Sequence, residues 1–150
     1  WYQHIKKNDI PTIDEGNDVL IKVLVGKVKN ISSAVQTYSP VSIFDVQFIN
    51  PSLIDLDIPK NQTVMVYVID GELKFSDDKQ IARKGQMIYF DQSSDMINLT
   101  SISPTGSYLV LSGEPLNETV VRYGPFVANT EGDMKKAMLD YQNGKMGTLS

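Results

Sequence analysis

A succession of short β-rich runs, separated by turn residues, constrains the fold of this chain more than any other feature. Most side chains in these runs are aliphatic, β-branched or aromatic, and each run has the length of a strand rather than a helix. The runs occupy residues 19–26, 41–49, 52–59, 63–71, 72–76, 86–90, 96–101 and 107–113. Such spacing is typical of an antiparallel β-sandwich or barrel, so we predict an all-β fold.

The run at 63–71 is apolar on both of its faces, because residues 64–69 include no polar side chain except the hydroxyl of Tyr67. We expect such a strand to be covered on both sides or to lie deep in a two-sheet core. Asp70 and Gly71 close the run and predict a tight hairpin turn. The sequence SDDK at 76–79 predicts the next turn.

One segment, 130–143, predicts a helix. Its apolar residues recur at helical spacing and are Met134, Ala137, Met138 and Tyr141. Asn129 or Thr130 is suited to cap its start, and Gly144 suits the left-handed position after its end. We therefore predict an antiparallel β-sandwich or barrel with one C-terminal α-helix.

The first residues, 1–17, are polar and lack a clear period. We interpret them as a linker or arm from a missing N-terminal domain, and residues 18–150 as the domain itself. Trp1, Tyr2 and Ile5 in this arm are available to dock on another surface.

Composition excludes several classes of function. The net charge of -4 and the scattered lysines do not favour direct nucleic-acid binding. The chain has no cysteine, which excludes disulfides and thiolate chemistry, and its single histidine, His4, lies in the arm without a nucleophile motif. The apolar runs are too short to span a bilayer and no signal peptide is recognisable, so we expect a cytoplasmic location and no membrane partner.

The strand rhythm, with Y-V-x-x-G-E at 67–72 and K-G-Q-M-I-Y-F at 84–90, resembles the cupin fold. Cupins hold a metal through G-x5-H-x-H-x3,4-E-x6-G. When the last Gly of this motif is aligned with Gly71, its Glu falls on Val64. Its two His positions then fall on one of two pairs, Asp57 and Pro59 or Ile58 and Lys60.

The second cupin motif, G-x5-P-x-G-x2-H-x3-N, aligns with Gly85 and places its His on Met96 and its Asn on Thr100. No expected His or Glu ligand remains, and only Asp57 offers an oxygen to a transition metal. We therefore expect no cofactor in this chain, with Val64 and Met96 filling the core.

Residues 111–147 identify a closer resemblance. They contain G-E-P-L-x-E-x-V-x-x-x-G-P-F-V-x-N-T, followed by a helix that ends in D-Y-x-x-G-x-x-G. This pattern closely resembles the carboxyl-terminal end of pirin-family proteins, although Ala128 and Thr119 stand where Met and Pro are usual. Residues 24–48 resemble the start of the same second domain, so the resemblance covers nearly the whole chain.

In the pirin family two cupin domains lie in tandem, and only the first carries an iron site, made of three His and one Glu. Some members oxidise flavonols such as quercetin with dioxygen, and eukaryotic members are described as nuclear transcription cofactors. The resemblance implies that this chain is the metal-free second domain, with iron expected only in a missing N-terminal domain. It carries no catalytic residue over to this chain.

The passage at 113–130 opposes phosphate binding, because it holds two acids and its prolines remove amide donors. It either carries the chain to the helix or forms a docking surface from Glu114, Asn117, Glu118 and Arg122. Three functions stay open. The domain is a structural or partner-binding half that packs on an N-terminal cupin half or a second copy, a part of an iron-dependent quercetin dioxygenase-like oxidoreductase, or a barrel that binds a small molecule.

Overall fold

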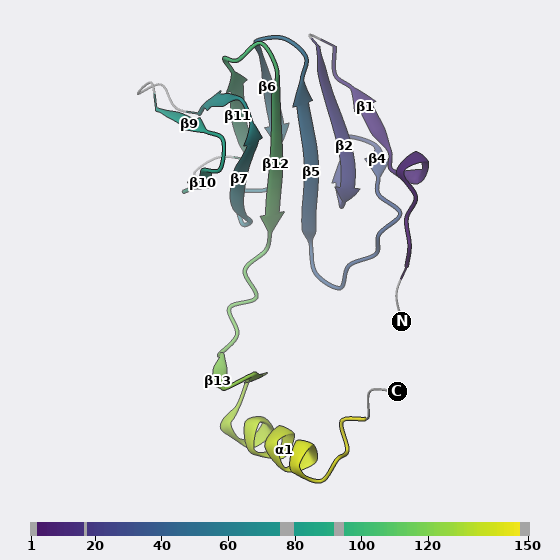
Figure 1. Ribbon diagram of the computed structural model, residues 1–150, viewed down its shortest axis with the longest axis vertical. Helices are drawn as coiled ribbons and strands as arrows, with labels where there is room; N and C mark the ends of the chain where they lie inside the picture. Colours follow the sequence, from purple (N-terminus) through teal and green to yellow (C-terminus); the bar gives the residue numbers. More distant parts are fainter. Residues whose placement is uncertain (1–2, 17, 76–79, 92–94, 148–150) are drawn as a thin grey trace. The chain divides into compact units, whose positions relative to one another are not determined.

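The structure is a computed structural model of residues 1–150, and it describes residues 3–16, 18–75, 80–91 and 95–147 (Figure 1). The chain forms two compact units, Trp1–Pro115 and Leu116–Ser150. Each unit is considered by itself below.

The first unit consists mainly of two antiparallel sheets. The larger has six strands in the order β1-β2-β5-β12-β7-β10, namely β1 (Thr12–Asp14), β2 (Val19–Val25), β5 (Val41–Phe48), β12 (Gly106–Gly113), β7 (Thr63–Asp70) and β10 (Met87–Phe90). The smaller has four strands in the order β6-β11-β8-β9, namely β6 (Ser52–Asp57), β11 (Met96–Ser101), β8 (Glu72–Lys74) and β9 (Ile81–Arg83). A short hairpin joins β3 (Lys27–Val28) to β4 (Ile31–Ser32). The predicted all-β antiparallel sandwich is confirmed.

Alternation along the strands builds the core between the two sheets. In β12 every second residue is buried, and β5 and β7 follow the same pattern over most of their length. The buried side chains of both sheets form one apolar cluster, which includes Phe44, Phe48, Val66, Leu73, Leu99, Tyr108 and Val110.

Strand β7 corrects one expectation. Val64, Val66 and Val68 are fully buried, but Tyr67 and Ile69 on the opposite face are 39% and 41% exposed. The strand is therefore covered on one side only within the described part of the chain. The outer face of the larger sheet is therefore apolar over β10, β7 and β12, whereas β5 and β2 carry the Lys22–Asp45 ion pair on that face.

The turn at Asp70 and Gly71 also differs from the expected hairpin. Strands β7 and β8 do not pair, because β7 lies in the larger sheet and β8 in the smaller one. The turn thus transfers the chain between sheets, and Gly71 adopts a φ of +86° that favours glycine. The turn predicted at 76–79 lies outside the described residues.

The expected arm includes regular structure. Residues Lys7–Asp9 form the short 3-10 helix η1, and β1 pairs with β2 as the edge strand of the larger sheet, where Ile13 packs against the core. A strand of three residues is too short to show a period, but the free edge of β2 supplies its hydrogen bonds. Ile5 is half-buried, and Trp1 and Tyr2 lie outside the described residues.

The second unit holds a hairpin and the predicted helix. Strands β13 (Val121–Tyr123) and β14 (Phe126–Ala128) pair across the two-residue turn Gly124-Pro125, in which Gly124 has a φ of +53°. Helix α1 (Glu131–Gln142) begins after Thr130, whose Oγ1 accepts a hydrogen bond from Asp133 N at 3.1 Å. The helix and its cap are confirmed, as is the left-handed Gly144 with a φ of +67°.

Candidate functional site

The positions at which the cupin motifs place metal ligands lie at the end of β6 and just after it, on β7 and on β11. Val64, the position of the Glu ligand, is fully buried on the inner face of β7. Asp57, Pro59 and Lys60 are exposed, whereas Ile58 is buried. Of the two proposed His registers, only the one that starts at Ile58 therefore places a residue inside the sandwich.

Met96 corrects the second motif. Strand β11 buries Ile97 and Leu99, while Met96 is 50% exposed and pairs with the exposed Asp57 on the neighbouring strand β6. The expectation that Met96 fills the core is wrong. Because side chains alternate along a strand, a shift of one residue exchanges the inner and outer faces, and Ile97 occupies the inward position.

The buried positions at or next to the motif positions are therefore aliphatic: Leu56 on β6, Ile58 just after it, Val64 on β7 and Ile97 on β11, all members of the buried cluster. Iron and related metals bind nitrogen, oxygen or sulfur donors, which none of these side chains offers, so the residues present do not fit the cupin metal. Elsewhere within residues 3–16, 18–75, 80–91 and 95–147, no three His, Cys, Asp or Glu side chains gather as a metal site would require.

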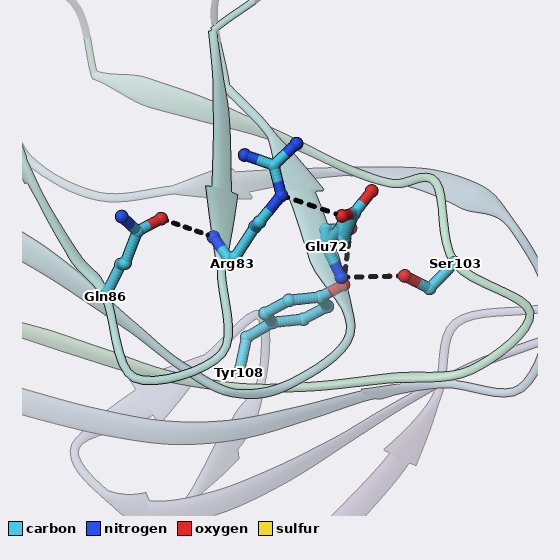
Figure 2. A network of polar contacts seen from close by, with 5 residues as sticks. All are labelled: Glu72, Arg83, Gln86, Ser103 and Tyr108. Atoms are coloured by element: carbon cyan, nitrogen blue, oxygen red, sulfur yellow. Dashed lines mark hydrogen bonds and ion pairs between the residues drawn. The ribbon is translucent and has the colours of Figure 1, made fainter.

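A polar network joins the two sheets at the turn that follows β7 (Figure 2). The hydroxyl of Tyr108, on β12, donates a hydrogen bond to the carbonyl of Glu72 on β8 at 2.9 Å. It lies 2.9 Å from Ser101 Oγ on β11. A tyrosine hydroxyl has one proton, so Ser101 donates to Tyr108. Burial raises the pKa of Tyr108, with smaller upward contributions from Asp70 and Glu72 and a downward one from the Ser101 hydrogen bond.

Glu72 is the centre of this network. Its amide N donates to Ser103 Oγ at 2.7 Å, and its carboxylate pairs with Arg83 Nε at 3.0 Å (Figure 2). Arg83 N in turn donates to Gln86 Oε1 at 2.7 Å. The network links β8, β9, β11 and β12, and its contacts within the protein indicate a structural role.

Two glycines make room for Tyr108. A Cβ at Gly106 would lie 2.4 Å from the Tyr108 hydroxyl and 2.6 Å from its ring. A Cβ at Gly71 would lie 3.2 Å from the Tyr108 hydroxyl and 2.7 Å from Thr105 O. The G-E pair at 71–72 is part of the motif that resembles cupins. At this pair, the buried Tyr108 of the larger sheet forms its hydrogen bond with the smaller sheet.

The four residues of the predicted docking surface are exposed, and they belong to both units. Glu114 lies in the first unit, where its N donates to Pro40 O at 3.1 Å. Asn117, Glu118 and Arg122 lie in the second unit, where Glu118 Oε2 accepts a hydrogen bond from Asn129 Nδ2 at 2.6 Å. Part of this passage therefore serves to hold the β13–β14 hairpin, and the docking role stays a prediction.

The outer face of the larger sheet is a feature that the sequence reasoning missed. Met87 pairs with Tyr67 on β7, and Tyr67 pairs in turn with Leu109 on β12. A second row parallel to it contains Tyr89, Met65, Leu111 and Ile43. The apolar character of 64–69 at both parities was the available signal, but it was interpreted as two-sided burial.

An antiparallel two-sheet sandwich with aliphatic side chains at its inward ligand positions defines a cupin-type domain without the usual ligand set. The family model for the pirin C-terminal cupin domain matches residues 43–147. This chain belongs to that family. No helix in the described part of the chain is long and apolar enough to cross a membrane.

Similar proteins extend the comparison. The chain is 33% identical over 148 residues to pirin of Rattus norvegicus and 32% identical over 149 residues to Pirin-1 of Arabidopsis thaliana, covering 97% of this chain in each case. It spans about half of these relatives, 50% and 52% of their lengths. A crystal structure of quercetin 2,3-dioxygenase from Acinetobacter baumannii superposes on 100% of this chain and 52% of that chain, with a TM-score of 0.85 and 29% identity.

Proposed function

We propose that this domain has no catalytic metal of its own and acts as the structural or partner-binding half of a pirin-like protein. The observation that carries the proposal is the packing of Leu56, Ile58, Val64 and Ile97 in the buried cluster. A metal in this interior would need several of these aliphatic side chains to be replaced by imidazole or carboxylate. The exposed apolar face of the larger sheet supports the partner-binding part of the proposal.

Metal analysis tests this proposal. The purified chain is incubated with Fe²⁺, Mn²⁺, Ni²⁺ or Zn²⁺, desalted, and examined by elemental analysis and thermal unfolding. We expect a metal content far below one per chain and an unchanged unfolding temperature, since a ligand that binds only the folded state would raise it. About one tightly held metal per chain would contradict the proposal.

His4→Ala provides the matched control, because His4 is the single histidine of the chain. It lies in an exposed segment outside the two sheets. Metal that disappears with this substitution is bound by the arm and not by the sandwich. Metal that persists without the imidazole is bound by other donor atoms of the chain, such as carboxylate oxygens.

A second candidate function belongs to a longer protein. Similarity to the quercetin 2,3-dioxygenase of Acinetobacter baumannii supports an oxidoreductase in which this domain packs beside a metal-bearing cupin half. Oxygen uptake with quercetin separates the two readings. We expect none from this chain alone, and uptake only from a protein in which the domain is joined to such a half.

The small-molecule alternative has less support, since the interior of the sandwich is occupied by side chains. Its remaining place is the surface, which carries open depressions. One of about 190 Å³ is lined by Lys60, Gln62, Thr63 and neighbouring residues, and one of about 360 Å³ is lined by Phe75, Ile81 and Met87 with their neighbours. Of these two, only the second reaches the roughly 300–1,000 Å³ of most ligand pockets, and it does so at the lower end.

A further inference from the structure

The four edge strands that the structure describes in the two sheets differ in charge. β1 ends in Asp14, β6 contains Asp55 and Asp57, and β9 ends in Arg83. β10, with the sequence MIYF, has neither a charge nor a proline. Charged residues and prolines are the usual means by which proteins keep an edge strand from pairing with another chain. The edge of β10 lacks this protection.

The backbone of β10 shows which groups face away from the sheet. Val68 N on β7 donates to Gln86 O at 2.9 Å, and the register then pairs Ile88 with Val66 and Phe90 with Val64. Hydrogen-bonded and outward-facing residues alternate along an antiparallel edge strand. The N–H and C=O groups of Met87 and Tyr89 therefore point away from β7, towards the edge on which no described strand pairs with β10.

We propose that β10 pairs with β10 of a second copy of this chain, antiparallel, about a twofold axis at Ile88. The axis places Met87 of each copy opposite Tyr89 of the other, so both outward-facing residues find partners. Each of these two pairs exchanges both N–H···O bonds across the interface. The two larger sheets then form one continuous sheet, and this inference does not depend on the proposed absence of a metal.

Side chains around the edge favour a second copy over an unrelated strand. Met87 and Tyr89 are 59% and 67% exposed on the outer face, and pairing places these apolar side chains against each other. Lys84 precedes β10 and Asp91 follows it, both exposed, and Lys84 Nζ also pairs with Asp70 Oδ1 of its own chain at 3.0 Å. Antiparallel pairing brings the Lys84 end of one strand towards the Asp91 end of the other, so opposite charges meet at both ends of the interface.

Two double variants test the pairing. Met87→Lys with Tyr89→Glu replaces each apolar cross-strand pair by an opposite-charge pair, whereas Met87→Lys with Tyr89→Lys places like charges opposite each other. Sedimentation equilibrium over a range of protein concentrations gives the dimer dissociation constant. We expect a dimer for the wild type and for the Lys/Glu variant. For the Lys/Lys variant we expect a dimer dissociation constant at least about tenfold higher, since each change acts twice in a twofold interface.

Far-ultraviolet circular dichroism and thermal unfolding first establish that both variants are folded, which these exposed positions favour. Should a variant fail to fold, amide hydrogen exchange of the wild type is the second measurement. Exchange at Met87 and Tyr89 should then slow as protein concentration rises, while exchange on β1 does not change with concentration. A wild type that stays monomeric, or a Lys/Lys variant that dimerises as well as the Lys/Glu variant, overturns the proposal.

Discussion

At the scale of single residues, the hydroxyl of Tyr108 forms hydrogen bonds that link the two sheets. It donates to Glu72 O and accepts from Ser101 Oγ in a region where Ser101 is 1% exposed. Tyr108→Phe would leave both partners without this contact and should lower the free energy of unfolding by about 1–3 kcal/mol, measured by urea denaturation. Ser101→Ala should cost less, because the tyrosine keeps its bond to Glu72. Equal stability of wild type and Tyr108→Phe would contradict the role of the network.

The raised pKa of Tyr108 predicts that the folded state loses stability at alkaline pH. Burial raises the pKa of Tyr108 above the ordinary value of 10.0, so the folded state holds this proton more tightly than the unfolded chain does. The stabilisation is complete below pH 10.0 and is lost as pH rises through the folded pKa. Unfolding free energies measured from neutral to strongly alkaline pH should fall more steeply for the wild type than for Tyr108→Phe. Parallel curves would show that this tyrosine does not control the decline.

At the scale of elements, burial along β11 shows which residue occupies the inward position near the His position of the second cupin motif. Ile97 is 4% exposed and its neighbour Met96 is 50% exposed. Ile97→Ala should cost roughly 2–5 kcal/mol, because it leaves a cavity in the core. Met96→Ala, one residue away on the same strand, should cost much less, and chemical denaturation of the two variants compares them directly. A larger loss for Met96→Ala would restore the register that the motif spacing indicated.

The strands of the two sheets show what a sequence pattern predicts and what it does not. Long β-rich runs such as 41–49 and 107–113 became β5 and β12, since strand propensity and length are local properties. The sheet that each strand joins depends on partners far along the chain, so the turn at Gly71 was misjudged as a hairpin. The wrong expectation for Met96 has a related cause. Successive side chains of a strand point to opposite faces, so an error of one residue in the motif alignment places a residue on the wrong face.

Helix α1 was predictable in more detail, because caps and helical spacing are also local. Thr130 caps its start, and Met134 is the residue of the apolar stripe that is buried. Thr130→Ala should destabilise the helix by about 1 kcal/mol and speed amide exchange in its first turn. Lys135→Ala, at an exposed position within the helix, should leave that exchange near its wild-type rate. Equal exchange in the two variants would indicate that hairpin packing, and not the cap, holds the helix start.

At the scale of the whole molecule, the outer face of the larger sheet is the part of the candidate site that sequence reasoning could not place. An apolar residue in a strand pattern has the same appearance whether it meets its own core or a partner. Tyr67 and Ile69 alternate with the fully buried Val66 and Val68, and only the structure assigns them to opposite faces. The chain spans about half of the length of the pirin relatives it matches, and the apolar face supports the proposed partner-binding role.

The apolar outer face should be measurable in the native state. We expect the folded chain to bind an environment-sensitive apolar dye, because monomeric soluble proteins rarely expose contiguous apolar patches larger than a few hundred Å². Tyr67→Ser combined with Ile69→Ser should reduce dye fluorescence while changing stability little, since both side chains are partly exposed. Val68→Ser, between them on the buried face, should instead lower stability by several kcal/mol and increase dye binding as the core loosens. If the outer-face double variant bound the dye as strongly as the wild type, the partner surface would have to be sought on another part of the molecule.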